Sequence, residues 1–320
     1  MRYLVTGGSG FLGANVVRQL LARGDQVRCI GRKPGICLQN LPIEFLTISL
    51  EDVEGLARVA EGCSGIFHIA GIFDPGPSGE AAMKKLHVDA TAALLKASQK
   101  AGVSRFLLCS SSITVGFGSL SLPGDEETPL NADAIYGKRG ALRTYYDSKL
   151  QAEMLVQQAG GVIVNPDFVL GAWDVKPTSG QSLLTMAKMP IPFYPRGGKC
   201  FIDADDCALG HLYALERGQS GRRYLLGNHN VSYRDFLRMC AQVAGRTPPF
   251  LPVPRSALWM AGKAGSLLQR VDTHRFAGLE PHVLLSMQQD RYRSGRRSWE
   301  ELGVPRTPLL QSIQKAWDWF

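Results

Sequence analysis

A glycine-rich turn lies between a short apolar strand and an amphipathic helix at the start of this chain of 320 residues. Residues 3–6 are strand-like, residues 6–13 read TGGSGFLG, and residues 11–22 have the apolar spacing of a helix. Glycine permits a tight turn and close approach of the backbone to a pyrophosphate, and a helix N-terminus offers unpaired N–H groups. The turn therefore predicts a dinucleotide-binding loop. The residues expected to bind the dinucleotide there are Gly7, Gly10, Phe11, Leu12 and Gly13.

The alternation of strand and helix continues for about 160 residues. Further strands are expected at 27–30, 45–49, 65–70, 105–110 and 162–164, and helices at 53–61, 80–101 and 142–159. This spacing predicts parallel βαβ units with right-handed crossovers. We therefore expect an α/β fold with a Rossmann-like doubly wound parallel sheet.

The regular alternation stops after this sheet, where prolines divide the chain into short pieces. We expect residues 1–170 to form the dinucleotide-binding domain, with residues 200–228 returning to it. Residues 171–320 are expected to form mainly a smaller C-terminal substrate-binding cap. The longest apolar segment, 257–268, contains Lys263 and is too short to span a membrane, so it predicts a partly buried helix.

The composition excludes several other classes of protein. The apolar share is 45% and the charged share 20%, which is typical of a globular protein. No charged leader precedes an apolar stretch, so we expect no signal peptide. Seven cysteines at irregular spacing and six histidines without a metal-ligand pattern predict reduced thiols, a cytoplasmic location and no metal site.

The net charge of +8 is compatible with a nucleic-acid surface, an anionic ligand or no specific partner. Most of the basic residues are scattered, so we expect no nucleic-acid partner. The densest basic cluster consists of Arg291, Arg293, Arg296 and Arg297. We interpret it as a solvated face, which is the common meaning of a charge run.

The end of the second expected strand bears on the choice of cofactor. An NAD site usually has Asp or Glu there, whereas this chain has Gly31, Arg32 and Lys33. A guanidinium suits bidentate binding of a phosphate. The pattern favours NADP, with Arg32 on the 2′-phosphate and NAD as the alternative cofactor. Both cations could also be solvated surface groups.

Tyr145 is followed four residues later by Lys149 within an expected helix. This spacing places both side chains on one helix face. A phenol is a poor base at neutral pH, and a nearby cation favours its ionised form. The pair could therefore move a proton to or from a substrate oxygen while hydride is transferred. A surface pair on a helix is the alternative.

Three serines, Ser110 to Ser112, close the fifth expected strand. In doubly wound sheets, ligands bind beyond the carboxyl ends of the strands, so one of these hydroxyls could hold a substrate oxygen. The alternative is that the serines satisfy their own backbone.

Together these segments resemble one superfamily over nearly the whole chain. TGGSGFLG, CSSSITVG and YYDSKLQAE resemble the extended short-chain dehydrogenase/reductases of the NAD-dependent epimerase/dehydratase type. HIAG, HVDATAALLKASQKAGVSRFLLCSS, DEETPL and FIDADDCALGHLYAL agree with that resemblance. NPDFVLGAWDVKPTSG and the position of Arg32 are most similar to dihydroflavonol-4-reductase-like proteins and hopanoid-associated sugar epimerases.

The resemblance implies a catalytic triad of Ser112, Tyr145 and Lys149, with Ser111 as the alternative serine. It also implies cofactor contacts from Ala70, Tyr145 and Lys149, and a homodimer formed by the helices at 80–101 and 142–159. Two departures from the family pattern are His87, where relatives usually have Asn, and Asn165 before Pro166, where many have Arg.

The expected function is an NAD(P)-dependent oxidoreductase, similar to dihydroflavonol reductase, that acts on a small carbonyl or carbinol. The alternative is a nucleoside-diphosphate-sugar epimerase with tightly bound NAD. Such epimerases hold the diphosphate with cap arginines, where this chain offers Lys199 and Arg291 or Arg293. A non-catalytic dinucleotide-binding protein is disfavoured by the triad. The residues expected to line an aromatic substrate pocket are Trp173, Lys176, Phe193, Tyr194 and Arg196.

Overall fold

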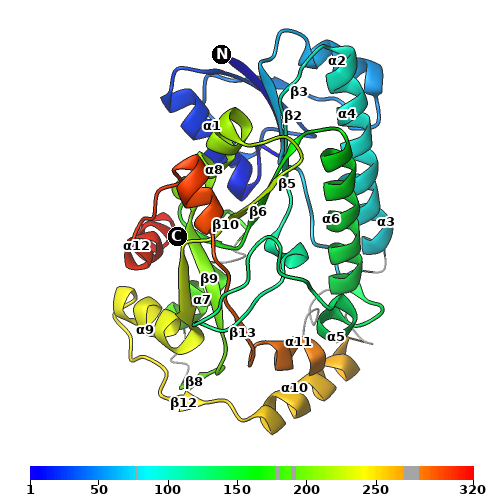
Figure 1. Ribbon diagram of the computed structural model, residues 1–320. Helices are drawn as coiled ribbons and strands as arrows, with labels where there is room; N and C mark the ends of the chain where they lie inside the picture. Colours follow the sequence, from blue (N-terminus) through cyan, green and yellow to red (C-terminus); the bar gives the residue numbers. More distant parts are fainter. Residues whose placement is uncertain (77, 177–179, 189–191, 270–280) are drawn as a thin grey trace.

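A parallel sheet of seven strands forms the centre of the molecule (Figure 1). The computed structural model describes residues 1–76, 78–176, 180–188, 192–269 and 281–320. The strands follow the order β10-β6-β5-β4-β1-β2-β3. Their bounds are β1 (Arg2–Thr6), β2 (Gln26–Ile30), β3 (Glu44–Leu46), β4 (Gly65–His68), β5 (Phe106–Cys109), β6 (Val162–Pro166) and β10 (Arg223–Leu226). This order confirms the predicted Rossmann-like α/β fold.

Helices cover both faces of the sheet. Helices α1 (Phe11–Ala22) and α8 (Ala204–Arg217) lie on one face, and α2 (Val53–Ala60), α4 (Ala90–Lys100) and α6 (Ala141–Gln158) lie on the other (Figure 1). Tyr3 and Val5 of β1 pack in the first apolar layer, whereas Leu4 packs in the second. Strands covered on both faces need apolar residues at successive positions, which explains the continuous apolar runs in the sequence.

Several element boundaries differ from the expected ones. The third strand is shorter, Glu44–Leu46, and the sixth continues to Pro166, which pairs with Leu226. The helix expected at 80–101 is α3 (Gly79–Lys84), a wider π-helical turn (Lys85–Asp89) and α4. The wide turn contains the buried His87, in agreement with the tendency of such turns to occur at functional sites.

The chain reverses direction across the sheet at β1. It passes from β1 to β2 and β3, and then returns to β4 on the other side of β1. The segments that leave β1 and β4 therefore diverge, and a ligand-binding crevice is expected at the carboxyl ends of these strands. The glycine loop and residues 69–71 lie at this crevice.

A smaller sheet follows β6 and lies below the large sheet in Figure 1. Its strand β9 (Gly198–Asp203) pairs with β7 (Phe168–Leu170), β11 (His229–Ser232) and β13 (Asp290–Arg291). Strands β8 (Phe193–Tyr194) and β12 (Leu251–Pro252) form a separate pair. The surrounding helices are α5 (Ala132–Tyr136), α7 (Gln181–Lys188), α9 (Tyr233–Val243), α10 (Arg255–Leu268), α11 (Pro281–Ser286) and α12 (Leu309–Trp319).

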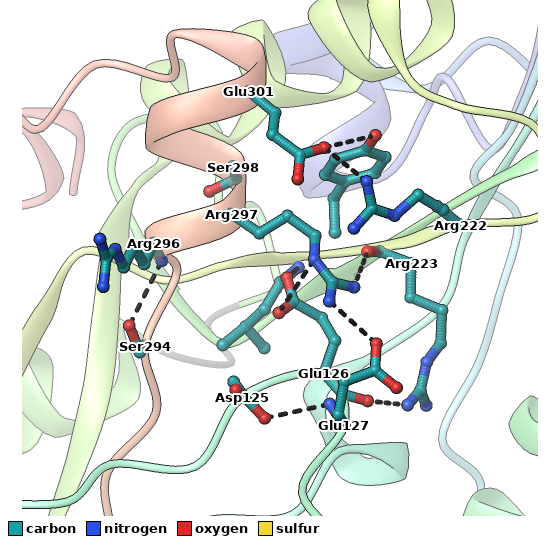
Figure 2. A network of polar contacts seen from close by, with 12 residues as sticks. Asp125, Glu126, Glu127, Arg222, Arg223, Ser294, Arg296, Arg297, Ser298 and Glu301 are labelled. Carbon is teal, nitrogen blue, oxygen red and sulfur yellow. Dashed lines mark hydrogen bonds and ion pairs between the residues drawn. The ribbon is translucent and has the colours of Figure 1, made fainter.

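Polar side chains close the outer edge of strand β10 (Figure 2). The Glu126 carboxylate accepts a hydrogen bond from Leu225 N at 2.7 Å, and Arg223 donates to the Glu126 carbonyl. Arg297 donates to the Arg223 carbonyl at 3.2 Å and to the Glu127 carboxylate at 2.9 Å. These contacts cover backbone groups that an open edge strand would offer to another chain.

The interpretation of the arginine cluster at 291–297 as a solvated face is wrong for all its members but Arg296. Arg293 is 3% exposed and forms a 2.7 Å ion pair with the buried Asp167, and Arg291 is partly buried. Arg297 is also partly buried and pairs with Glu127, whereas Arg296 is exposed and pairs with the exposed Glu300. The carboxylates that neutralise Arg293 and Arg297 come from distant parts of the chain, which a local charge pattern does not show.

Helix α10 is more exposed than the sequence predicts. Among its residues, the buried ones are Gly262 and Gly265, and its larger apolar side chains are partly or fully exposed. No helix in the described part of the chain combines the length and hydropathy needed to cross a membrane.

Candidate active site

The glycine loop packs so closely that side chains are excluded. Gly7 has a φ of +72°, and a Cβ atom there would lie 2.6 Å from the backbone nitrogen of Ala70. A Cβ atom at Gly13 would lie 2.1 Å from the carbonyl oxygen of Gly7. Both distances are far below van der Waals contact, so glycine is required at these positions. The loop thereby brings bare backbone to the crevice.

Helix α1 points its N-terminus at the same crevice. It begins at Phe11 after Gly10, has no side-chain N-terminal cap, and carries no acidic residue in its first turn. The first N–H groups of a helix have no intrahelical partner and form its positive dipole end. The backbone N–H groups of Phe11 and Leu12 thus fit a pyrophosphate, as predicted for a dinucleotide.

The end of strand β4 is tied to the glycine loop through Thr6. The Thr6 hydroxyl accepts hydrogen bonds from Ile69 N at 3.2 Å and Ala70 N at 3.1 Å, and lies 2.7 Å from His68 Nδ1. Ala70 is therefore held directly beside Gly7 at the carboxyl ends of β1 and β4. Its contact with a cofactor stays a prediction.

The loop after β2 carries two exposed cations, Arg32 and Lys33. Within the described residues, neither side chain has an ion-pair or hydrogen-bond partner. The loop lies against the glycine loop, because a Cβ atom at Gly35 would be 3.3 Å from Ser9 Cβ. Two cations without a partner among the described residues therefore stand in the loop beside the glycine loop.

Tyr145 and Lys149 lie on one face of α6, as their spacing predicts. Lys149 Nζ donates to the Cys109 carbonyl at 3.1 Å and lies 5.9 Å from the centre of the Tyr145 ring. A Cβ atom at Gly71 would lie 3.1 Å from this ammonium, so the glycine leaves room for it. The ammonium is thus placed between the carboxyl ends of β4 and β5.

His87, in the wide turn between α3 and α4, contacts α6 through Ser148. Its Nε2 accepts a hydrogen bond from Ile72 N at 3.1 Å, so the ring proton is on Nδ1 and is directed to Ser148 Oγ, 2.8 Å away. Burial, and then the charge of Lys149, lower the pKa of His87 to about 3. The ring is therefore neutral with both nitrogens engaged. This geometry makes His87 a positioning residue and leaves it no free nitrogen for a proton relay.

The Tyr145 ring is held between two other rings. Phe73 and His87 pack against it in edge-to-face geometry, with centroid distances of 5.6 and 5.5 Å. Such contacts restrict the ring's orientation. Phe73 is 47% exposed and so presents an apolar surface next to the phenol.

The three serines after β5 have different surroundings. Ser110 Oγ donates to the Glu153 carboxylate, and Ser111 Oγ accepts from Ile113 N at 3.3 Å. Ser112 begins a short 3-10 turn (Ser112–Thr114) that packs on α6. Its hydroxyl has no hydrogen-bond partner within the described part of the chain. Of the three, Ser112 is the serine left available for a substrate oxygen.

Glu153 organises this turn, and the sequence analysis missed it. Ser110, Thr114 at 2.6 Å and Asn165 at 2.7 Å all donate to its Oε1, and Arg223 lies 3.5 Å from its Oε2. The carboxylate is 2% exposed. Its position four residues after Lys149 on the same helix face was the available signal. Its carboxylate thus binds Ser110 and Thr114, on the two sides of Ser112 in the sequence. Asn165, which precedes Pro166, supplies the third donor to the same oxygen.

A second group of charges lies between the smaller sheet and the loop after Ser112. Lys199 of β9 and Arg291 of β13 are neighbours in register, and both are partly buried. Burial lowers the pKa of each side chain. Asp167, the carboxylate near them, is already paired with Arg293. Lys199, Arg291 and Arg293 together carry more positive charge than the single carboxylate of Asp167 neutralises. This excess of positive charge favours an anionic ligand group.

The predicted aromatic pocket is not formed. Trp173 stacks between Arg18, at 3.4 Å, and Trp319, at 4.4 Å, next to α1. Phe193 and Tyr194 lie instead in β8, beside β12 at the far end of the molecule (Figure 1). The sequence does not show how these short segments pair with other strands. The prediction therefore wrongly grouped Trp173 with Phe193 and Tyr194 in one pocket.

Comparisons with known proteins agree with this geometry. The family described as NAD dependent epimerase/dehydratase matches residues 3–227. A protein from Synechocystis sp. assigned as a dihydroflavonol 4-reductase is 32% identical over 335 residues, 99% of this chain and 94% of that protein. Sterol demethylase protein B of Methylococcus capsulatus is 27% identical over 326 residues, 100% of this chain and 98% of that protein.

A solved structure shares the fold over the whole chain. A nucleoside-diphosphate-sugar epimerase from Pseudomonas aeruginosa superposes with a TM-score of 0.78 and 26% identity. The match covers 100% of this chain and 97% of that one.

The Glu153 network predicts a stability effect. Glu153→Gln should lower the free energy of unfolding by about 2 kcal/mol or more, because buried donors lose a charged acceptor. Glu127→Gln is the matched control, since Glu127 is largely exposed and its ion pair should contribute less than about 1 kcal/mol. Urea unfolding measures both. Equal midpoints for the two variants would show that Glu153 does not brace the serine turn.

Proposed function

This chain belongs to the NAD-dependent epimerase/dehydratase family, and we propose that it works within it as an NADP-dependent reductase or dehydrogenase. The reacting carbon is a carbonyl or carbinol carbon of a small molecule, in a dihydroflavonol-reductase-like reaction. The observation that carries the proposal is that α6 bears Tyr145 and Lys149 on one face and packs on the turn of Ser112, whose hydroxyl has no hydrogen-bond partner among the described residues. In this proposal the substrate is bound mainly by residues 171–320.

In the reducing direction, Ser112 donates a hydrogen bond to the substrate oxygen and Tyr145 donates a proton to it. In the oxidising direction, Tyr145 accepts that proton. Lys149 stabilises negative charge on the phenol oxygen and is itself held by the Cys109 carbonyl. When bound, the dinucleotide supplies or accepts the hydride.

The residues present fit such a dinucleotide. Gly7, Gly10 and Gly13 leave room for its pyrophosphate against the N-terminus of α1, and Ala70 lies beside Gly7. In this proposal Lys149 binds the nicotinamide ribose as well as acting on Tyr145. Arg32, which has no ion-pair partner among the described residues, would bind a 2′-phosphate.

One observation favours a second function, a nucleoside-diphosphate-sugar epimerase. The excess positive charge of Lys199, Arg291 and Arg293 would suit a diphosphate, and the solved relative from Pseudomonas aeruginosa carries that name. An epimerase oxidises and then reduces the same substrate, so it retains its dinucleotide. A reductase exchanges it at every turnover.

All seven cysteines are unpaired and buried thiols. Such thiols are typical of a reducing compartment, and we place the enzyme in the cytoplasm on this ground.

The proposed triad predicts a specific loss of turnover. Tyr145→Phe should lower kcat by about 10² or more, the scale of general acid–base catalysis, with the fold intact. Lys149→Met should impair both dinucleotide binding and turnover. Tyr146→Phe is the control, because this neighbour packs on Tyr136. Steady-state rates with any accepted carbonyl substrate test this. Near wild-type turnover in Tyr145→Phe would refute the mechanism.

The cofactor proposal predicts a preference that one residue reverses. NADPH should bind at least about tenfold more tightly than NADH, because one charge-assisted phosphate contact contributes about 1.5–3 kcal/mol. Arg32→Asp should reverse this order by repelling the 2′-phosphate. Arg58→Asp, an equal charge change on the exposed surface of α2, should not.

Fluorescence titration with the five tryptophans measures both affinities. Equal affinities for the two nucleotides in the wild-type protein, or purified protein that already contains NAD, would favour the epimerase instead.

We also expect a homodimer formed by α3, α4 and α6, on the resemblance to the family. The apolar side chains of Tyr146, Leu150 and Met154 follow one another at four-residue spacing on α6, and Met154 is 52% exposed. Light scattering should give about twice the chain mass of 34.9 kDa, and Met154→Glu should lower it. Leu122→Glu, in an exposed loop, should not. A monomer mass for the wild-type protein would contradict the dimer.

A further inference from the structure

Helix α10 carries an exposed apolar stripe at the end of the molecule opposite α2 (Figure 1). Trp259, Met260 and Leu267 are 49%, 60% and 62% exposed. Residues three, four, seven and eight positions apart lie on the same side of a helix, so these side chains share one face with Lys263. The stripe therefore combines large apolar groups with a cation.

The opposite side of α10 is the one that packs on the protein. Gly262 and Gly265 are buried, and a Cβ atom at Gly262 would lie 2.4 Å from Pro281 Cα at the start of α11. The helix thus turns its glycines inward and its large apolar side chains outward. A surface helix ordinarily does the reverse, so its own packing does not explain the apolar stripe.

The charge of this segment restricts what can cover it. Residues 250–269 contain the exposed Arg255 and Lys263 and no Asp or Glu. The Lys263 ammonium lies 5.4 Å from the Trp259 ring. A surface that meets this segment must therefore accept apolar side chains and supply negative charge.

The turn before α10 extends the apolar surface. Phe250 and Leu251 are 63% and 43% exposed, and Pro252 and Pro254 separate them from the helix. Exposed Trp, Phe and Leu beside Arg and Lys suit the interface of an anionic bilayer, where rings lie at headgroup level and cations meet phosphates.

We propose that α10, together with the turn at Phe250 and Leu251, docks this enzyme on the surface of a membrane that contains anionic phospholipid. Docking is peripheral and uses side chains that are already exposed. Helix α11, on which α10 rests, packs against α5, the helix that precedes α6 and Tyr145. The docked face therefore lies on the side of the molecule that carries the smaller sheet and away from α1 and α2.

Sedimentation of the full chain with vesicles tests the proposal. The protein should bind vesicles made of phosphatidylcholine and phosphatidylglycerol in equal parts, bind pure phosphatidylcholine much more weakly, and detach as salt is raised. The double variant Trp259→Ser, Met260→Ser should bind about tenfold more weakly or worse, because both side chains lose apolar area. Lys263→Glu should weaken binding about fivefold or more, since it removes a cation and adds a carboxylate.

Matched variants separate docking from general effects. Leu122→Ser removes an even more exposed apolar group and Arg58→Glu inverts an exposed charge, both outside α10 and its preceding turn, and neither should change binding. Thermal unfolding should be the same for all variants, because every changed side chain is exposed. In Trp259→Phe, binding should persist while the blue shift of tryptophan emission on vesicles is lost.

Three results would overturn the proposal. One is equal binding to neutral and anionic vesicles, and another is wild-type binding by the double variant. The third is a double variant that loses oligomer mass in light scattering while the wild-type protein does not bind vesicles, which would identify the stripe as a contact between copies of this chain.

Discussion

The contact between helix α1 and strand β1 at the glycine loop is the constraint on which the candidate site depends. At Gly13 a single methyl group would be driven into the Gly7 carbonyl, and at Gly7 into the backbone of Ala70. Because glycine has no Cβ atom at these positions, the N-terminus of α1 and the ends of β1 and β4 can meet. They meet at the point where the strand order reverses. Bare amide groups and a positive dipole are thereby concentrated at one point.

The ends of the neighbouring strands position Lys149 and the serine turn. Lys149 is fixed by a carbonyl at the end of β5, and the serine turn that follows is held by the buried carboxylate of Glu153. Both residues come from α6, so one helix carries Tyr145, Lys149 and the carboxylate that holds the serine turn. Ser110 donates to that carboxylate and Ser111 accepts from Ile113 N, whereas the Ser112 hydroxyl has no hydrogen-bond partner among the described residues.

Features encoded by neighbouring residues could be predicted from the sequence. The glycine loop, the order of strands and helices, and the pairing of Tyr145 with Lys149 depend on spacings of a few residues. The ion pair of Arg293 with Asp167 joins residues 126 apart and depends on the register of the smaller sheet, so a local pattern gave the wrong environment. The sequence predicts a partly buried helix at 257–268 but not which of its residues are buried, and these are the glycines Gly262 and Gly265.

The buried Arg293 also has a consequence for how such enzymes can be recombined. Its guanidinium contacts the carbonyls of Val115 and Gly116, just after the serine turn, as well as Asp167 at the end of β6. A chimera that exchanged the C-terminal half for that of a relative without this arginine would leave a buried carboxylate and two carbonyls without a partner. The segment that follows β13 and the loop after the serine turn can therefore be exchanged only together in this chain, because Arg293 contacts both.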